Sequence, residues 1–263
     1  MRVLVFGGNR FMGKALVDEL LDLNLDVTIF NRSGTGSPHV KIIKGDRNNE
    51  EDIKNLHLKN FDFIFDMCLF KPEQYKLMEK YLLESNPRKY TFISSASVGN
   101  KDFGDYAIEK EQVEKLIKES NLNYTIIRPV YVVGENSHRP RLGYYINKLK
   151  NNKPISIDGN GNKLINLVHI EDVVELIKST MFTHDRKTII SSNGETLSVL
   201  DIINKIAKFL NIEEIKTEKG NESPFIDSKF VFNKTEESYK SLDDMLPEYY
   251  KWLELKGNKK YGY

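Results

Sequence analysis

The chain contains very little cysteine: Cys68 is the only one among its 263 residues. A single cysteine cannot form an internal disulfide, and it excludes the cysteine-rich structural zinc sites. The five histidines are dispersed and show no spacing typical of metal ligands. We therefore expect no metal site.

The sequence also lacks a strong charge of either sign and lacks a long apolar run. Lys and Arg number 39 against 38 Asp and Glu, and the two signs are interspersed. Nucleic acids and anionic membranes are bound by basic surfaces, so we expect neither as a partner. No basic leader, cleavage site or bilayer-spanning run is visible, and we expect a cytoplasmic protein.

The most informative segment is the start of the chain, where an apolar run over 3–6 leads into a glycine-containing turn at 7–13. An unbroken apolar run is typical of a buried parallel strand, and glycines let backbone N–H groups approach a pyrophosphate at a helix N-terminus. The helix expected at 14–23 and the strand expected at 27–30 complete a βαβ unit. We predict that the turn binds a dinucleotide through Gly7, Gly8, Asn9, Arg10, Phe11, Met12 and Gly13.

Strands and helices alternate along the first half of the sequence. Strands are expected at 2–6, 27–30, 40–43, 61–67, 90–93 and 124–128, and helices at 14–23, 50–56, 73–84 and 106–119. Alternation of this kind requires a parallel sheet with helices on both faces, and ligands then bind where the strand order reverses. The predicted fold class is α/β, a Rossmann-type doubly wound parallel sheet with a small C-terminal substrate lobe.

Past Pro129 the composition changes to Gly, Asn and Lys with short apolar pieces. We expect a strand and turn at 153–161, a return to the core through 164–168, a helix at 171–181, a strand at 188–191 and a helix at 199–210. The predicted organisation is a dinucleotide-binding domain of residues 1–130, completed by 164–191, and a small substrate-binding lobe of residues 131–163 and 192–263.

Tyr106 and Lys110 lie one turn apart and therefore on the same face of a predicted helix. A nearby ammonium, helped by the positive ring of an oxidised nicotinamide, favours the phenolate and lowers the pKa of Tyr106 toward neutrality. Alone, this spacing indicates an exposed Tyr and Lys on a solvated helix. The strand over 90–93 changes the balance, because it ends in Ser94–Ser97, where a hydroxyl can bind a substrate oxygen beside Tyr106.

Taken together, these segments resemble the NAD(P)-dependent epimerase/dehydratases, the extended and atypical branch of the short-chain dehydrogenase/reductases. The resemblance covers most of the chain and rests on GGNRFMG at 7–13, GD at 45–46, SSASV at 94–98, YAIEK at 106–110, IIRPVYVVG at 126–134 and LVHIEDVVELI at 167–177. The short spacing between Asp66 and Ser95 resembles that of a small atypical subgroup, which includes chloroplast stem-loop RNA-binding relatives.

The resemblance implies roles for individual residues. Tyr106 would be the acid/base, Lys110 its partner and the ribose-binding group, and Ser95 the hydroxyl that orients the substrate. The other cofactor contacts would fall on Asp46 at the adenine, on the backbone of Met67 and Cys68, and on Pro129 and Val130 beside the nicotinamide. His169, inside LVHIED, is expected to be a buried packing residue.

Departures from the family pattern bear on the cofactor. Arg10 stands in place of the middle glycine of the turn, and Asn31 and Arg32 close the second strand where an acidic residue would hold the ribose hydroxyls of NAD. Guanidinium groups pair bidentately with phosphate, so Arg10 and Arg32 favour NADP(H) over NAD as the NAD(P) cofactor. The alternative is two solvated surface arginines.

Substrate contacts follow less directly. Many epimerases and dehydratases carry Asn where Tyr131 stands, and this departure weakens the nucleotide-sugar interpretation, although Tyr131 is kept as a candidate substrate contact. Arg141, followed by Tyr144 on a predicted helix, is the candidate for binding an anionic group such as a diphosphate. An exposed arginine at a helix start explains Arg141 equally well.

These residues predict an NAD(P)-dependent oxidoreductase or epimerase that acts on a nucleotide sugar or a similar small hydroxyl or carbonyl substrate. Hydride would move between the nicotinamide and a substrate carbon while Tyr106 transfers the proton and Ser95 stabilises the oxyanion. The alternative is a non-catalytic NAD(P)-sensing regulator or an RNA-binding protein on the same fold. Val113, Leu116 and Ile117 would serve either a homodimer interface, as in relatives, or the monomer core.

Overall fold

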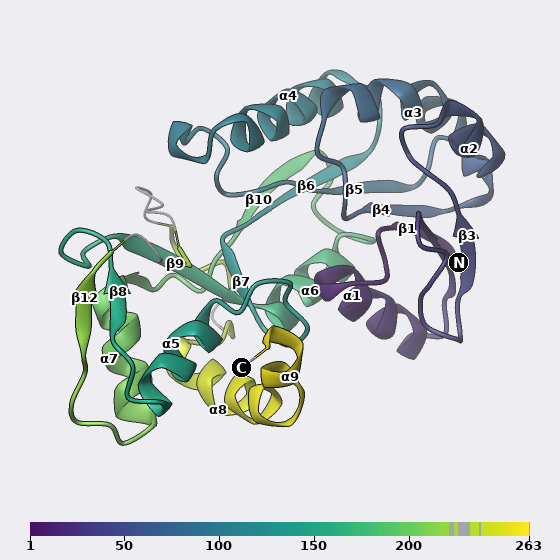
Figure 1. Cartoon of the computed structure of the whole chain (residues 1–263). Helices are drawn as coiled ribbons and strands as arrows, with labels where there is room; N and C mark the ends of the chain where they lie inside the picture. The colour runs from purple at the N-terminus through teal and green to yellow at the C-terminus, as the bar shows by residue number, and fades with distance from the viewer. Residues whose placement is uncertain (221–223, 226–231, 237, 263) are drawn as a thin grey trace. The chain divides into compact units, whose positions relative to one another are not determined.

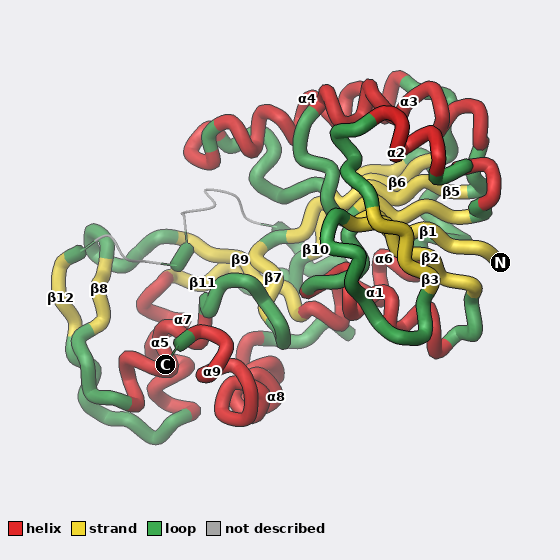
Figure 2. Tube along the Cα trace, turned by 45° about the vertical axis from the view of Figure 1, so that its right-hand side comes forward, coloured by secondary structure: helices red, strands yellow, loops and turns green. Residues whose placement is uncertain are grey.

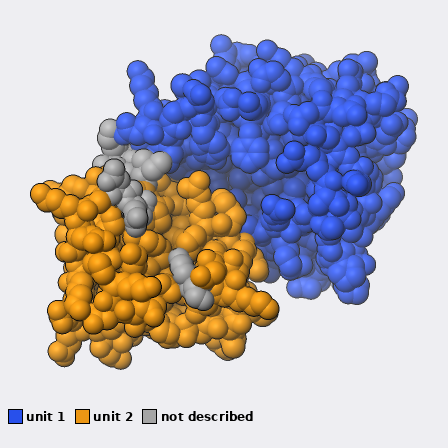
Figure 3. Space-filling model, viewed as in Figure 1, with its two compact units in different colours: residues 1–129, 173–191 blue, residues 130–172, 192–263 orange. Residues whose placement is uncertain are grey.

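The computed structural model describes residues 1–220, 224–225, 232–236 and 238–262. The chain divides into two compact units, residues 1–129 with 173–191 and residues 130–172 with 192–263 (Figure 3). Each unit has its own sheets and its own buried core.

The first unit is built on a seven-stranded sheet in the order β10-β6-β5-β4-β1-β2-β3. Its strands are β1 (Arg2–Phe6), β2 (Asp26–Asn31), β3 (Lys41–Lys44), β4 (Phe63–Asp66), β5 (Lys89–Ile93), β6 (Tyr124–Pro129) and β10 (Lys187–Ser191). All neighbouring strands pair in parallel. The order reverses between β1 and β4, which confirms the predicted doubly wound fold.

Helices cover both faces of this sheet (Figure 1, Figure 2). The helices of the first unit are α1 (Phe11–Asp22), α2 (Glu50–Asn55), α3 (Pro72–Ser85), α4 (Asp105–Glu119) and most of α6 (Ile170–Ser179), with 3-10 turns at Leu58–Asn60 and Lys101–Phe103. Leu4 and Phe6 pack with α2, α3 and α4 on one face, while α1 and α6 lie on the other. Burial on both faces explains why β1 is apolar without alternation.

The second unit contains two small sheets. β7 (Tyr131–Val133), β9 (Leu164–His169) and β11 (Thr196–Ser198) form one in the order β11-β9-β7, and β8 (Ile155–Ile157) pairs with β12 (Thr217–Lys219) in the other. Its helices are α5 (Leu142–Lys150), α7 (Val199–Phe209), α8 (Leu242–Trp252) and α9 (Asn258–Tyr261), with a π-helical turn at Leu253–Gly257. Their apolar faces enclose a core that includes Tyr145, Ile202 and Trp252.

The division of the chain differs from the expected one at residues 164–172. We expected this segment to complete the dinucleotide-binding domain, but β9 pairs with β7 and β11 and therefore lies in the second unit. The chain returns to the first unit within α6, at Val173. An apolar pattern predicts that a strand forms, but it does not specify which sheet the strand joins.

Candidate active site

The turn between β1 and α1 brings the two backbones very close together. Gly7 has a φ of +82°, in the left-handed region that favours glycine. A Cβ on Gly13 would overlap the carbonyl oxygen of Gly7, and a Cβ on Gly8 would lie 2.6 Å from Cγ2 of Ile29. The N–H groups at the start of α1 therefore lie at the carboxyl end of β1 with no side chain on these glycines, which fits a pyrophosphate.

Asn31, at the end of β2, shapes the loop that follows it. Its Oδ1 accepts hydrogen bonds from the Gly34 N–H at 2.8 Å and the Ser33 hydroxyl at 2.9 Å, and its Nδ2 donates to the Thr35 carbonyl at 2.8 Å. Asn9 Nδ2, in the glycine turn, donates to the Ser33 hydroxyl at 3.0 Å. Asn31 thus fixes the shape of this loop, and Asn9 joins the loop to the turn. The sequence alone did not predict either contact.

The other predicted contacts of the adenosine end lie around Asp46. The Asn48 N–H and the Asn48 side-chain amide donate to Asp46 Oδ1 at 2.9 and 2.7 Å. Hydrogen bonding by Asn48 and the charge of Arg32 hold the pKa of Asp46 below its ordinary value. Arg10 and Arg32 are both exposed. Asp46 is therefore ionised at neutral pH, and Arg32 lies within electrostatic range of it.

A buried ion pair that the sequence did not predict lies beside these residues. Arg47 Nη1 and Nη2 donate to the two carboxylate oxygens of Asp66, each at 2.8 Å. Burial lowers the pKa of Arg47, but the charge and hydrogen bonds of Asp66 outweigh it and raise that pKa above its ordinary value. The sequence signals were an arginine directly after the Gly-Asp motif and an aspartate that ends the otherwise apolar β4.

Tyr106 and Lys110 project from the first turns of α4 toward the segments that follow β4 and β5. Lys110 Nζ donates to the carbonyl oxygens of Leu69 and Ile93, both at 2.7 Å, and lies 5.9 Å from the centroid of the Tyr106 ring. Lys110 is 2% exposed, whereas Tyr106 is 41% exposed. Burial lowers the pKa of Lys110 to about 7. The amine is therefore fixed beneath the tyrosine ring by the ends of two strands.

The two serines after β5 have different surroundings. Ser94 is buried, and its hydroxyl donates to Glu114 Oε1 at 2.6 Å. Ser95 is half-buried, and its Oγ accepts from the Ser97 N–H at 3.1 Å and the Ser97 hydroxyl at 2.8 Å. The Ala96 N–H donates to the Pro129 carbonyl at 3.0 Å, which brings Pro129 beside this segment. Of the two serines, Ser95 is therefore the less buried.

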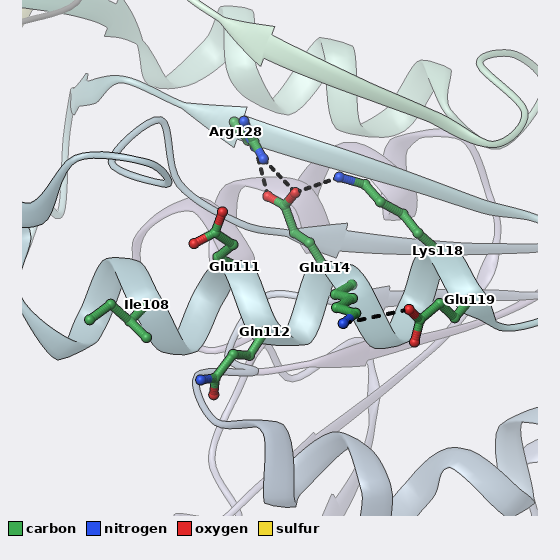
Figure 4. Close-up of a pocket in the computed structure, with 8 residues that line it drawn as sticks. Ile108, Glu111, Gln112, Glu114, Lys118, Glu119 and Arg128 are labelled. Carbon is green, nitrogen blue, oxygen red and sulfur yellow. Dashed lines mark hydrogen bonds and ion pairs between the residues drawn. The ribbon is translucent and has the colours of Figure 1, made fainter.

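Glu114 fixes α4 against the sheet. Its carboxylate accepts from Arg128 Nε and Nη2 at 2.7 and 2.6 Å and from Lys118 Nζ at 2.9 Å (Figure 4). Burial raises the pKa of Glu114, but the hydrogen bonds from Arg128, Ser94 and Lys118 outweigh it, and the net pKa lies below the ordinary value. An open groove of about 490 Å³ runs along this side of α4, lined by Ile108, Glu111, Gln112, Glu114, Lys115, Lys118, Glu119 and Arg128.

The apolar residues of α4 belong to the core of the first unit. Val113 and Ile117 are fully buried, and Leu116 packs against the same core. Of the two roles considered for them, the structure therefore shows the packing of the monomer.

The predicted substrate residues gather in the second unit. The guanidinium carbon of Arg141 lies 4.3 Å from the ring centroid of Tyr131 and 5.6 Å from that of Phe225. Arg141 Nη1 also donates to the Pro224 carbonyl at 3.0 Å. Tyr144 packs edge-on against its neighbour Tyr145 in the same cluster. Arg141 has a φ of +32°, a strained conformation for a residue with a side chain.

Three further observations concern the rest of the described chain. His169 is 2% exposed in β9, and burial and the charge of Lys240 lower its pKa, as suits a packing residue. Within the described ranges, no helix is both long and apolar enough to span a bilayer. Those ranges also contain no group of three or more His, Cys, Asp or Glu that could hold a metal ion.

Comparison with known proteins gives a family match and one curated relative. The model of the NAD(P)H-binding family matches residues 7–157. The chloroplast stem-loop binding protein of 41 kDa b from Arabidopsis thaliana is 27% identical over 203 residues, which cover 65% of this chain and 53% of that protein. The chain thus spans about half the length of the curated relative it matches.

Solved structures share the fold at low sequence identity. UDP-glucose 4-epimerase from Thermotoga maritima, solved with UDP-glucose, matches with a TM-score of 0.80 and 14% identity over 97% of this chain and 99% of that one. The enzyme WbmG from Bordetella bronchiseptica, solved with NAD and UDP, matches with a TM-score of 0.78 and 12% identity over 98% of this chain and 96% of that one. At these identities the similarity establishes the fold alone.

Proposed function

Because the chain belongs to the NAD(P)H-binding family, whose model matches residues 7–157, we propose that it is an NAD(P)-dependent oxidoreductase or epimerase. Its substrate would be a nucleotide sugar or a similar small hydroxyl or carbonyl compound. The observation that carries the proposal is the position of Lys110, which is bonded to the carbonyls of Leu69 and Ile93 beneath the ring of Tyr106. This arrangement sets a phenol and an amine at the carboxyl ends of β4 and β5, the edge where dinucleotides bind in such sheets.

We assign two tasks to the chain's own residues: they bind the dinucleotide and the substrate, and they transfer a proton. The N–H groups of the turn at 7–13 would bind the pyrophosphate of the dinucleotide, whose nicotinamide would supply the hydride-transfer chemistry. Tyr106 exchanges a proton with the substrate oxygen, and its phenolate is favoured whenever the amine of Lys110 is protonated. The hydroxyl of Ser95 donates a hydrogen bond to the same substrate oxygen and orients it.

The choice of cofactor and substrate rests on charge. Arg10 and Arg32 are exposed near the turn and the end of β2, and no acidic residue ends that strand, which favours NADP(H). The nucleotide-sugar assignment is supported by Arg141, whose guanidinium lies against the rings of Tyr131 and Phe225 in the second unit. An arginine over aromatic rings suits a ligand that combines a diphosphate with a planar base.

Replacing a single hydroxyl tests the proposal. The wild-type protein, incubated with NAD or NADP and a panel of nucleotide sugars such as UDP-glucose and UDP-glucuronic acid, should oxidise or epimerise at least one of them. Tyr106→Phe should abolish turnover with cofactor affinity unchanged. The control Tyr81→Phe removes another phenol, which bonds Glu50 on α2, and should keep full activity. Full turnover by Tyr106→Phe would refute the assigned role.

A second candidate function is RNA binding without catalysis, favoured by the similarity to the Arabidopsis thaliana stem-loop binding protein. Binding to phosphates would depend strongly on salt. Filter binding of a stem-loop RNA over a range of salt concentrations separates the two candidates. Tight, salt-sensitive binding with no turnover of any nucleotide sugar would favour the RNA-binding function.

A further inference from the structure

Arg47 and Asp66 come from distant parts of the first unit and meet in its interior. In the sheet, β3, which precedes Arg47, is separated from β4, which ends at Asp66, by β2 and β1. The guanidinium lies over the ring of Phe6, with its central carbon 5.2 Å from the ring centroid, and reaches both oxygens of Asp66. The pair therefore spans the point at which the strand order reverses.

Asp66 connects this pair to the segment that follows β4. The Tyr90 hydroxyl, buried in β5, donates to Asp66 Oδ2 at 2.9 Å. The Cys68 N–H donates to Asp66 Oδ1 at 3.3 Å. The carboxylate thus fixes the backbone at Met67 and Cys68, because a buried carboxylate with several donors has one low-energy orientation.

The turn that carries Arg47 is linked to the same segment a second time, at the surface. Asn48, whose amide groups hold Asp46, accepts a hydrogen bond from Gln74 Nε2 at 3.0 Å. Gln74 Oε1 in turn accepts from the N–H groups of Phe70 and Lys71 at 3.0 and 3.2 Å. A buried ion pair and an exposed amide contact therefore join the same two segments.

We propose that Arg47 and Asp66 are positioning residues that keep Asp46 at a fixed distance from Met67 and Cys68, so that the protein presents a preformed pocket for the adenosine half of the dinucleotide. The inference rests on the proposed function. The two side chains are 8% and 0% exposed, so they act through their neighbours and not by touching the ligand. A preformed pocket binds more tightly, because its loops are already ordered before the ligand arrives.

The test separates the two halves of the cofactor. Removing one partner would leave a buried charge unpaired, whereas replacing both with apolar residues is tolerated in many proteins. The double variant Arg47→Met/Asp66→Leu should therefore fold, as checked by thermal unfolding. In calorimetric titrations its affinity for ADP-ribose and NADPH should fall at least about tenfold, because the pocket must now be ordered on binding. Its affinity for nicotinamide mononucleotide should stay within about twofold of wild type.

A matched control lies at the other end of β4. Asp62 directly precedes this strand and faces Arg88, with an Nε–Oδ1 distance of 3.9 Å. Arg88→Met should leave all three affinities unchanged. If the double variant folds and binds ADP-ribose as the wild type does, or loses both halves equally, the positioning role is wrong. If the wild type binds neither NADH nor NADPH, the proposed function fails, and this inference fails with it.

A second measurement covers a double variant that does not fold. Arg47→Lys keeps the positive charge but cannot bond both oxygens of Asp66. Hydrogen exchange of the Asp46 and Asn48 amides, both bonded to carboxylates, should then be faster than in wild type, with exchange in β5 unchanged. Equal exchange rates at Asp46 and Asn48 would overturn the inference without any reference to a cofactor.

Discussion

Replacement of Lys110 by methionine gives the sharpest test of the buried amine. In the folded protein the pKa of Lys110 falls from 10.5 to about 7 because of burial. One pKa unit corresponds to about 1.36 kcal/mol, so keeping this ammonium buried below neutral pH costs at most about 5 kcal/mol of folding free energy. Methionine has a similar length and no charge, so Lys110→Met removes that cost.

The variant is tested by the pH dependence of its stability and not by its stability at one pH. The reason is that a second effect opposes the stability gained by removing the ammonium. Methionine leaves the carbonyls of Leu69 and Ile93 without their donor, at about 1–3 kcal/mol each. At neutral pH the two effects are therefore of similar size. Above pH 7 the folded state holds Lys110 neutral while the unfolded state keeps its proton, so the free energy of unfolding of the wild type rises with pH.

Urea unfolding of the cofactor-free protein followed by circular dichroism measures this slope. From about pH 7 to about pH 9 the wild type should gain about 2 kcal/mol relative to Lys110→Met, because the slope reaches its full value of about 1.36 kcal/mol per pH unit only above the folded pKa. Lys115→Met, an exposed lysine on the same helix, should show no such trend relative to wild type. Parallel curves for the wild type and Lys110→Met would refute the conclusion that the amine is buried with a lowered pKa.

Three further substitutions test other parts of the account. Glu114→Gln should destabilise the protein by about 2 kcal/mol near neutral pH, because Arg128 loses its charged partner. That difference in urea unfolding should shrink as the pH falls through the lowered pKa of Glu114, and a constant difference would contradict the assignment. Gly13→Ala should cost about 1–3 kcal/mol and weaken dinucleotide binding, because the new Cβ would overlap the Gly7 carbonyl, whereas the neighbouring Lys14→Ala should do neither. Arg32→Ala should lower the calorimetric affinity for NADPH more than that for NADH, and an equal loss of both would argue against a 2′-phosphate contact.

The sequence was sufficient to predict those elements whose signal lies within a short segment. The apolar run of β1, the glycines at 7–13 and the alternation of strands and helices up to Pro129 each follow from short-range periodicity, and the structure places these elements close to the expected positions. The spacing of Tyr106 and Lys110 likewise follows from the geometry of one helix. Local patterns therefore predicted the doubly wound sheet correctly.

Contacts between distant segments could not be predicted in this way. Arg47 and Asp66 are brought together across two strands, and no periodicity links an arginine in one turn to an aspartate at the end of another strand. The sheet joined by β9 depends on pairing with β7 and β11, which an apolar pattern does not specify. The role of Asn31 in holding its loop depends on the fold of the next few residues.

Contact between the nicotinamide ring and Tyr106 is the central claim, and nuclear Overhauser effects measure it directly. The protein is labelled on its tyrosine rings and saturated with NADPH, and the signals of Tyr106 are assigned by their absence from Tyr106→Phe. The account predicts cross-peaks between the nicotinamide protons and the ring protons of Tyr106. A bound dinucleotide whose nicotinamide shows no cross-peak to Tyr106 would contradict it.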